Sequence, residues 1–239
     1  QFDNTLVRPG ERVLLVGNLE AFQTRYGRDL PIVGVYQDQG MNRLSNSGEQ
    51  LTLVDATGQE MVSLEWSDRF PWPVSADGRG YSLLPIGPNR MDLSVASHWR
   101  SSATVGGNPA SNDSVPLSDW MSDFGVEDFG TDLDGDGWDT VSEYISGSDP
   151  RSSEELPRFE VLFEEGGEGE MFLIVDIVVE IGHDDVQIRP LLSSDLEEWS
   201  NEVAYAGRWN NGDGTATVRF RSEVPVSDRA AQFIQLGVV

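Results

Sequence analysis

The sequence predicts an all-β protein, with two β-sandwiches joined by a linker and a short helical loop. Three observations lead to this prediction. Short apolar runs alternate with turn residues along most of the chain, which is typical of sandwiches. A stretch rich in Ser, Gly, Asn and Pro divides the chain near its middle. The few helical patterns are short, and a hydrophobic content of 38% supports packed cores rather than disorder.

Residues 1–108 are expected to form the first sandwich. Asn18 can cap a short helix, because its side chain can accept a hydrogen bond from a free backbone N–H of the first turn. Phe22 and Tyr26 lie one turn apart on that helix, and Gly27 ends it. The strands predicted for this part of the chain are 12–16, 31–36, 50–54, 59–66 and 80–84.

Residues 109–118 are expected to be a linker, and residues 153–239 the second sandwich. The linker prediction depends on segment 101–116, which has almost nothing to bury. Segment 210–214 (NNGDG) is the strongest hairpin signal in the chain, because Asn, Asp and Gly suit tight turns. The strands predicted for this part are 159–163, 171–181, 186–192, 204–209, 215–220 and 231–239.

Residues 119–152 hold the stretch whose spacing dictates chemistry. Residues 132–143 (DLDGDGWDTVSE) fit the calcium-loop template D-x-[DN]-x-[DN]-G-x₅-E without a gap. Alternating aspartates can face one hard cation, Gly137 permits the sharp turn, and a distal glutamate can close the shell. A solvated acidic turn is the alternative. The expected calcium ligands are Asp132, Asp134, Asp136, the backbone carbonyl of Trp138, and Glu143. Short helices are predicted at 117–124 and 140–146.

The charge balance excludes several classes of function. The chain has 41 acidic and 16 basic residues, a net charge of -25, and all its basic residues are arginines. Such a surface repels nucleic acid and anionic membranes. The absence of lysine and cysteine excludes a Schiff base, a thiol nucleophile and a zinc–thiolate cluster. No apolar run reaches the roughly 18 residues that would indicate membrane insertion.

A series of short motifs crosses about ninety residues of the first part. They are Leu6 with 9–12 (PGER), Asn18 with 21–22 (AF) and 25–27 (RYG), 44–49 (LSNSGE), 51–53 (LTL) with Asp55 and Gly58, 66–68 (WSD), 71–73 (PWP), 76–78 (ADG) and 80–83 (GYSL). Their order and spacing resemble a bacterial lamin tail domain. The resemblance implies an immunoglobulin-like sandwich of an extracellular protein.

The opening strand pair of such domains is missing from this chain, so the resemblance implies a sandwich that is incomplete at its N-terminus. The chain begins without Met and is expected to be a processed or trimmed product. A sandwich without its opening strands exposes unpaired strand edges and apolar faces. We therefore expect another copy of the chain, or a partner protein, to supply strands; the alternative is that the first residues pair differently from those of the family.

Two further resemblances concern the rest of the chain. Segment 120–150 is similar to the calcium loops of dockerins and thrombospondin type 3 repeats, which implies a bound calcium ion. Asp139 stands where a paired loop usually has an apolar residue, so a single loop is expected. Segments 193–199 (SSDLEEW) and 231–236 (AQFIQL) resemble β domains that end secreted proteins of planctomycete and verrucomicrobial type. Together these imply an extracellular or cell-surface location.

The sequence offers weak candidates for an active site. His98 is expected at a strand end, and residues 183–185 (HDD) are expected in an exposed turn after Gly182. There is no G-x-S-x-G motif. Trp66 and Trp72 are expected in the core, whereas Trp199 and Trp209 are candidates for a sugar-stacking surface.

We therefore predict a secreted or cell-surface protein that is not an enzyme and has a structural or adhesive role. Calcium would rigidify the connector between the two sandwiches, and assembly would proceed through an open sheet edge. The alternative is an extracellular carbohydrate-binding module, with a polysaccharide as its partner.

Overall fold

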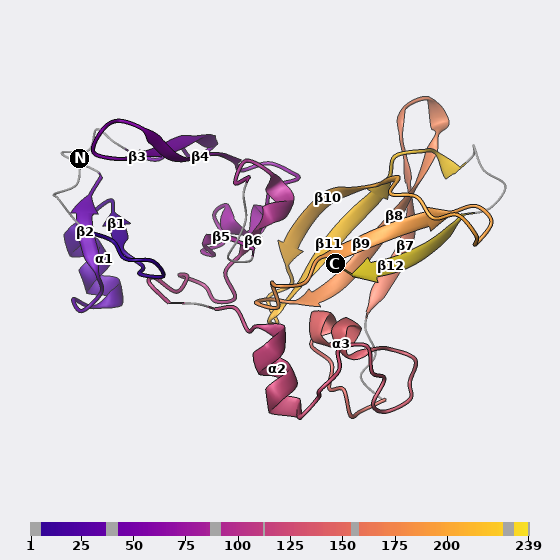
Figure 1. Cartoon of the computed structure of the whole chain (residues 1–239). Coiled ribbons are helices and arrows are strands. Elements are labelled where there is room, and N and C mark those ends of the chain that lie inside the picture. The colour runs from indigo at the N-terminus through magenta and orange to yellow at the C-terminus, as the bar shows by residue number, and fades with distance from the viewer. Residues whose placement is uncertain are drawn as a thin grey trace.

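The computed structural model describes residues 6–36, 43–86, 92–111, 113–153, 158–226 and 232–238, and it is largely β (Figure 1). The elements of the N-terminal half are β1 (Leu14–Val16), α1 (Leu19–Tyr26), β2 (Ile32–Val35), β3 (Gly48–Val54), β4 (Glu60–Ser67), η1 (Val74–Ala76), β5 (Leu83–Pro85), η2 (Ala96–His98) and β6 (Trp99–Ser101). Those of the C-terminal half are α2 (Leu117–Phe124), α3 (Thr140–Ser146), β7 (Phe159–Glu165), η3 (Gly167–Gly169), β8 (Met171–Glu180), β9 (Ile188–Ser193), β10 (Val203–Asn210), β11 (Thr215–Ser222) and β12 (Phe233–Val238).

The described strands of the N-terminal half pair two by two. β1 and β2 are parallel, whereas β3–β4 and β5–β6 are antiparallel (Figure 1). The predicted helix cap is confirmed, since Asn18 Oδ1 accepts a hydrogen bond from the Ala21 N–H at 2.9 Å. The predicted pair Phe22–Tyr26 is also in contact, with ring centroids 4.7 Å apart. The strands predicted at 50–54 and 59–66 form the antiparallel β3–β4 ribbon.

The C-terminal half contains a four-stranded antiparallel sheet in the order β10-β11-β8-β7 and a second pair, β12–β9 (Figure 1). The hairpin predicted at 210–214 is confirmed by the pairing of β10 with β11. Gly212 and Gly214 both have positive φ there, at 88° and 97°, which is the backbone region that favours glycine.

The main core lies on one face of the four-stranded sheet. Alternate residues of β8, from Leu173 to Val179, and Ile181 directly after the strand face the helices α2 and α3 and the pair β9–β12. The loop segment predicted as a connector therefore shares its core with the C-terminal sheet. The buried members of this core are Trp120, Val141, Tyr144, Ile145, Leu173, Val175, Ile177, Val179, Ile181, Leu192, Ala216, Val218 and Phe220.

The other face of β8 carries charged and aromatic residues. Asp176 pairs with Arg219 of β11 through two hydrogen bonds of 2.7 and 2.6 Å. Arg219 also lies over the ring of Trp209, and Arg221 lies over Phe172. Arginine side chains thus cover apolar surface that would otherwise be open to solvent.

The junction between the two halves has its own small core. Trp72 and Trp99 pack against each other with ring centroids 5.9 Å apart, and Tyr205 of β10 contacts both this cluster and the main core. Asn210 reaches across the junction, because its N–H donates to Ser75 Oγ at 2.9 Å and its side-chain amide donates to the Ser102 carbonyl at 3.3 Å.

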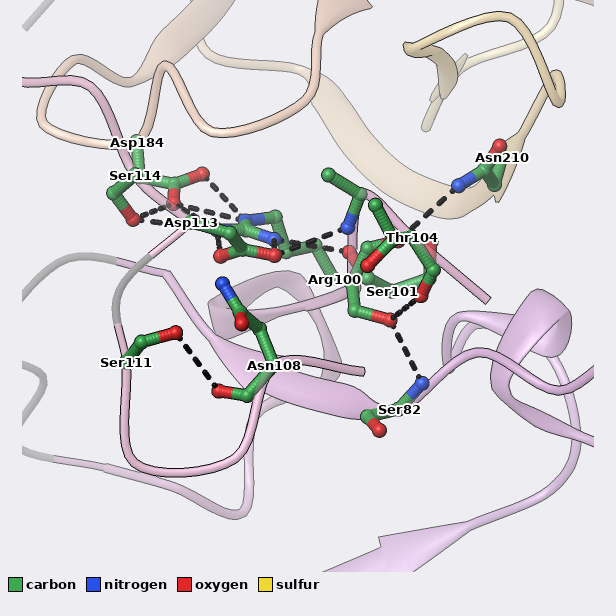
Figure 2. Close-up of polar contacts among 12 residues, drawn as sticks. Ser82, Arg100, Ser101, Thr104, Asn108, Ser111, Asp113, Ser114, Asp184 and Asn210 are labelled. Carbon is green, nitrogen blue, oxygen red and sulfur yellow. Dashed lines mark hydrogen bonds and ion pairs between the residues drawn. The ribbon is translucent and has the colours of Figure 1, made fainter. Parts of the chain in front are cut away.

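A buried charge network holds this junction (Figure 2). Arg100 of β6 is only 1% exposed. Its Nε and Nη2 donate to the carboxylate of Asp184, at 2.8 and 2.7 Å, and its Nη2 donates to Asp113 Oδ1 at 2.5 Å. Ser114 completes the network by donating its hydroxyl to Asp184 at 2.6 Å. One guanidinium therefore connects β6, the 113–114 segment and the turn after β8.

Part of the predicted linker is ordered by these contacts. The Val115 N–H donates to the Gly182 carbonyl at 2.9 Å, and Asp113 Oδ2 accepts from the Ala103 N–H at 3.0 Å. A Cβ atom at Gly182 would clash with the Asp113 carbonyl oxygen, so this close approach requires glycine. The predicted domain boundaries at 108, 118 and 152 stay predictions, but residues 113–115 lie firmly against the C-terminal half.

Replacing Arg100 tests how much this network stabilises the fold. We expect Arg100→Met to lower the free energy of unfolding by roughly 3–5 kcal/mol, because two nearly buried carboxylates lose their counter-charge. The control is Arg69→Met, since Arg69 is 87% exposed and lies 3.9 Å from Asp68. That change is expected to cost less than about 1 kcal/mol. Urea denaturation measures both, and equal losses would contradict the assignment.

Candidate metal centre

The loop before α3 brings three aspartates together. One carboxylate oxygen from each of Asp132, Asp134 and Asp136 lies within 4.8 Å of the others. Gly135 and Gly137 both have positive φ, 80° and 99°, and they let the loop fold back on itself. Three of the five sequence-predicted ligands, the aspartates, are therefore neighbours in space as well as in sequence.

Backbone hydrogen bonds fix one side of each aspartate. Asp132 accepts from the N–H groups of Gly135 and Gly137 at 2.8 and 2.9 Å, and these bonds lower its pKa, the Gly137 bond most strongly. Asp134 and Asp136 each use Oδ1 to accept from a backbone N–H, at 3.2 and 2.8 Å. Their Oδ2 atoms are buried and have no hydrogen-bond partner. The loop thus holds its carboxylates in place while two oxygens are left uncompensated.

Glu143 carries the strongest signal of the site. Its side chain is 0% exposed, and neither Oε1 nor Oε2 has a hydrogen-bond partner. Burial and the charges of Asp134 and Asp136, followed by those of Asp132 and Asp149, raise the pKa of Glu143 to about 7. A buried carboxylate beside three others needs either a proton or a cation. The donor set, all carboxylate oxygens, suits a hard divalent cation.

Trp138 lies in the loop as the template requires. Its backbone N–H donates to Asp136 Oδ1, and its ring packs edge-on against Phe159 of β7 with centroids 6.1 Å apart. The role predicted for its carbonyl as a ligand stays a prediction. This ring contact joins the aspartate loop (residues 132–143) to β7, an edge strand of the four-stranded sheet.

The two ends of the loop are joined to each other. The N–H and hydroxyl of Thr140 both donate to the Thr131 carbonyl, at 2.9 and 2.8 Å, and the Val141 N–H donates to the Phe129 carbonyl at 3.1 Å. Asp139 caps α3 by accepting from the Ser142 N–H at 2.9 Å. The loop is therefore closed at its base, and Glu143 is held on the first turn of a capped helix.

Tyr144, next to Glu143, anchors this helix to the turn after β8. Its side chain is 0% exposed, and its hydroxyl donates to the Val115 carbonyl at 2.7 Å and also contacts the carboxylate of Asp185. Its ring stacks on His183 with centroids 4.2 Å apart and planes 7° from parallel. The His183 Nδ1–H donates to the Tyr144 carbonyl.

Residues 183–185 therefore contact several distant segments of the chain, which was not predicted from the sequence. The expected turn is present, but Asp184 is only 3% exposed and binds Arg100. Asp185 accepts from the Leu117 N–H at 2.8 Å, at the start of α2. The order of three polar residues after a glycine was the available signal, but it does not reveal partners that lie 41 and 84 residues away.

The other candidates have structural contacts. His98 lies at the end of η2, directly before β6, and its Nδ1–H donates to the Asp92 carbonyl at 2.6 Å. Trp72 is buried and Trp66 is half-buried, in line with their predicted packing. Trp199 and Trp209 are half-buried, and Arg219 covers the ring of Trp209.

Comparisons with known proteins give no match, so the function is inferred from the geometry of the structure. No protein-family model, curated protein or solved structure matches the chain. The resemblances to lamin tail domains, dockerins and secreted-protein β domains thus stay predictions. No helix among the described residues is long and apolar enough to cross a membrane.

The pKa of Glu143 predicts how the cation-free protein responds to pH. The folded state holds the proton up to about pH 7, whereas the unfolded chain releases it near 4.5. This contribution to stability is therefore complete below pH 4.5 and is lost as the pH rises through about 7. In chelator, we expect the wild type to lose roughly 1–3 kcal/mol more than Glu143→Gln between about pH 5 and pH 8. Denaturation at each pH measures this, and parallel curves would refute it.

Proposed function

We propose that the chain is a calcium-dependent structural module and not an enzyme. The observation that carries this proposal is the carboxylate of Glu143, which is completely buried and unpartnered beside three converging aspartates. In a chain with no lysine and few arginines, no basic side chain lies against it among the described contacts. A divalent cation would neutralise these charges and satisfy the free oxygens at once.

Calcium fits this donor set better than other divalent cations. Calcium accepts six to eight oxygen ligands with flexible geometry, whereas magnesium demands a near-ideal octahedron and keeps several waters. Zinc and copper favour histidine and cysteine ligands. The chain has no cysteine, and both histidines lie outside the loop. We expect this site to bind calcium with a Kd of roughly 10⁻⁴ to 10⁻³ M, which is typical of extracellular calcium modules. We therefore propose an extracellular or cell-surface location.

The bound ion would act on shape. It would hold Glu143 and the aspartates in one arrangement, and Glu143 belongs to the helix whose Tyr144 packs into the main core. The same helix contacts the turn that carries Asp184, the partner of Arg100 at the junction. Calcium would in this way rigidify the connection between the two halves. The described strand pairs are compatible with the proposed two sandwiches, the first of them immunoglobulin-like and incomplete.

The β3–β4 ribbon supports a further part of the proposal, which is assembly through open sheet surface. Leu51, Leu53 and Val62 lie on one face of this ribbon and are 36%, 43% and 40% exposed. The middle of the opposite face is polar, and Thr52 contacts Ser63 there at 3.2 Å. Among the described strands, β3 and β4 pair only with each other, so both outer edges can accept a strand. A structural or adhesive role follows from such contacts with another copy or partner.

The alternative, a carbohydrate-binding module, has no observation that favours it. None of the seven tryptophans is among the exposed large apolar side chains. It stays a prediction from the sequence.

Calcium titration of the wild type and Glu143→Gln tests the metal site. At a hundredfold excess over Kd, calcium is expected to stabilise the wild type by about 2.7 kcal/mol. Glu143→Gln removes the repulsive charge and the bidentate ligand together. We therefore expect the calcium affinity of this variant to be less than a tenth of the wild-type affinity. In chelator at pH 8 it is expected to be at least as stable as the wild type. Calorimetric titration and thermal melting measure both effects.

The control for this experiment is Glu197→Gln, which removes one exposed carboxylate outside the loop. It is expected to bind calcium as the wild type does. An unchanged wild-type melting curve on adding calcium or chelator would overturn the proposed site.

Sedimentation equilibrium tests assembly through the β3–β4 ribbon. The wild type is expected to self-associate with rising concentration, and Leu53→Lys is expected to weaken this association at least tenfold, because a charge enters the apolar face. Thr52→Lys places the same charge on the polar face of the same strand and is the matched control. A wild type that stays monomeric at high concentration, or equal effects of the two variants, would count against assembly through this face.

A further inference from the structure

A cavity of about 180 Å³ lies at the junction of the two halves, and none of the expected metal ligands lines it, although Ile145 of α3 does. Ile86 and His98 line it from the N-terminal half, and Val218 and Phe220 line it from the four-stranded sheet. Two further lining residues, Tyr205 and Arg208, come from β10. Most of the wall is apolar, so any polar group that faces the cavity is informative.

Arg208 is a buried cation without a counter-ion in contact. It is 8% exposed, its Nε is completely buried, and its side chain has no hydrogen-bond or ion-pair partner among the described residues. The arginines Arg100 and Arg219 each hold a carboxylate through two or more hydrogen bonds. The chain has 41 acidic and 16 basic residues, so every buried arginine is expected to have a carboxylate partner. Arg208 differs from this expectation.

The largest influence of opposite sign is Asp184, but its oxygens already accept hydrogen bonds from other groups. They accept from Arg100 Nε and Nη2 and from the Ser114 hydroxyl. Asp184 therefore favours the charge on Arg208 at a distance, while burial is the larger effect and lowers the pKa of Arg208. The charge of the guanidinium is thus only partly compensated within the chain.

A second donor faces the same cavity. The hydroxyl of Tyr205 is buried and has no hydrogen-bond partner. Its ring packs edge-on against Phe220 with centroids 6.2 Å apart, so the side chain is held in place by aromatic contact. Arg208, with an unpartnered Nε, and Tyr205, with an unpartnered hydroxyl, thus line the same cavity.

We propose that this cavity is a binding site for a small organic monocarboxylate. The carboxylate would accept hydrogen bonds from Arg208 and from the Tyr205 hydroxyl, and the organic part would contact the apolar wall. The volume is close to that of an engineered cavity of about 150 Å³ that binds benzene, so a benzoate-sized acid fits. A phosphate would need more donors than these two side chains present, and its hydration would be lost against apolar walls. None of the expected calcium ligands lines this site.

Calorimetric titration of the full-length chain with benzoate, in excess calcium and at fixed chloride concentration, tests the proposal. Saturable binding of benzoate is expected. Arg208→Gln is expected to abolish it. Tyr205→Phe keeps the ring packing and removes only the donor, so it is expected to weaken binding about tenfold.

Two controls decide the outcome. Arg79→Gln removes one exposed positive charge far from the cavity lining and is expected to bind benzoate as the wild type does. Benzyl alcohol has a similar shape without charge and is expected to show no saturable binding. The proposal is overturned if the wild type shows no saturable binding of benzoate. It is equally overturned if Tyr205→Phe and Arg208→Gln, each shown to be folded by circular dichroism, bind benzoate as tightly as the wild type.

Discussion

The constraint on which this structure depends is the shortage of positive charge for its buried carboxylates. The chain has 41 acidic residues and 16 arginines, so a carboxylate that enters the interior must find one of a few cations. Asp184 and Asp113 share Arg100, and Asp176 pairs with Arg219. Glu143 finds no basic partner, although it is as completely buried as any residue in the chain. The buried carboxylates of the Arg100 network therefore have a counter-charge, whereas Glu143 in the loop has none, and a metal ion could supply it there.

The loop and the junction are physically continuous, and this gives the proposed calcium site a consequence beyond its own ligands. Glu143 and Tyr144 are adjacent on α3, and Asp184 and Asp185 are adjacent in the turn after β8. Tyr144 contacts Asp185, while Asp184 binds Arg100 of β6. Four residues and two direct contacts thus connect the proposed metal site with β6.

Local features were predictable from the sequence and long-range ones were not. The helices α2 and α3, the Asn18 cap, the 210–214 hairpin and the aspartate loop all follow from spacing within about a dozen residues. Arg100 and Asp184 are 84 positions apart, and no local pattern marks either as buried. Segment 113–115 has the composition of a linker, yet its backbone is used by the Gly182 turn, because glycine there permits close approach. Composition reports what a segment can bury, and it does not report what the segment can hydrogen-bond.

The contacts of α3 also change the role that is expected for the aspartate loop (residues 132–143). From its position between two predicted sandwiches, the loop is expected to act as a joint whose stiffness varies with calcium. In the structure, Val141, Tyr144 and Ile145 of α3 belong to the main core with β8 and β11. A helix that contributes buried side chains to a core cannot loosen without opening that core. Loss of the proposed calcium ion is thus expected to destabilise the C-terminal half before it allows movement between the halves. The reason is that the repulsion at Glu143 acts on a helix that covers one face of the sheet.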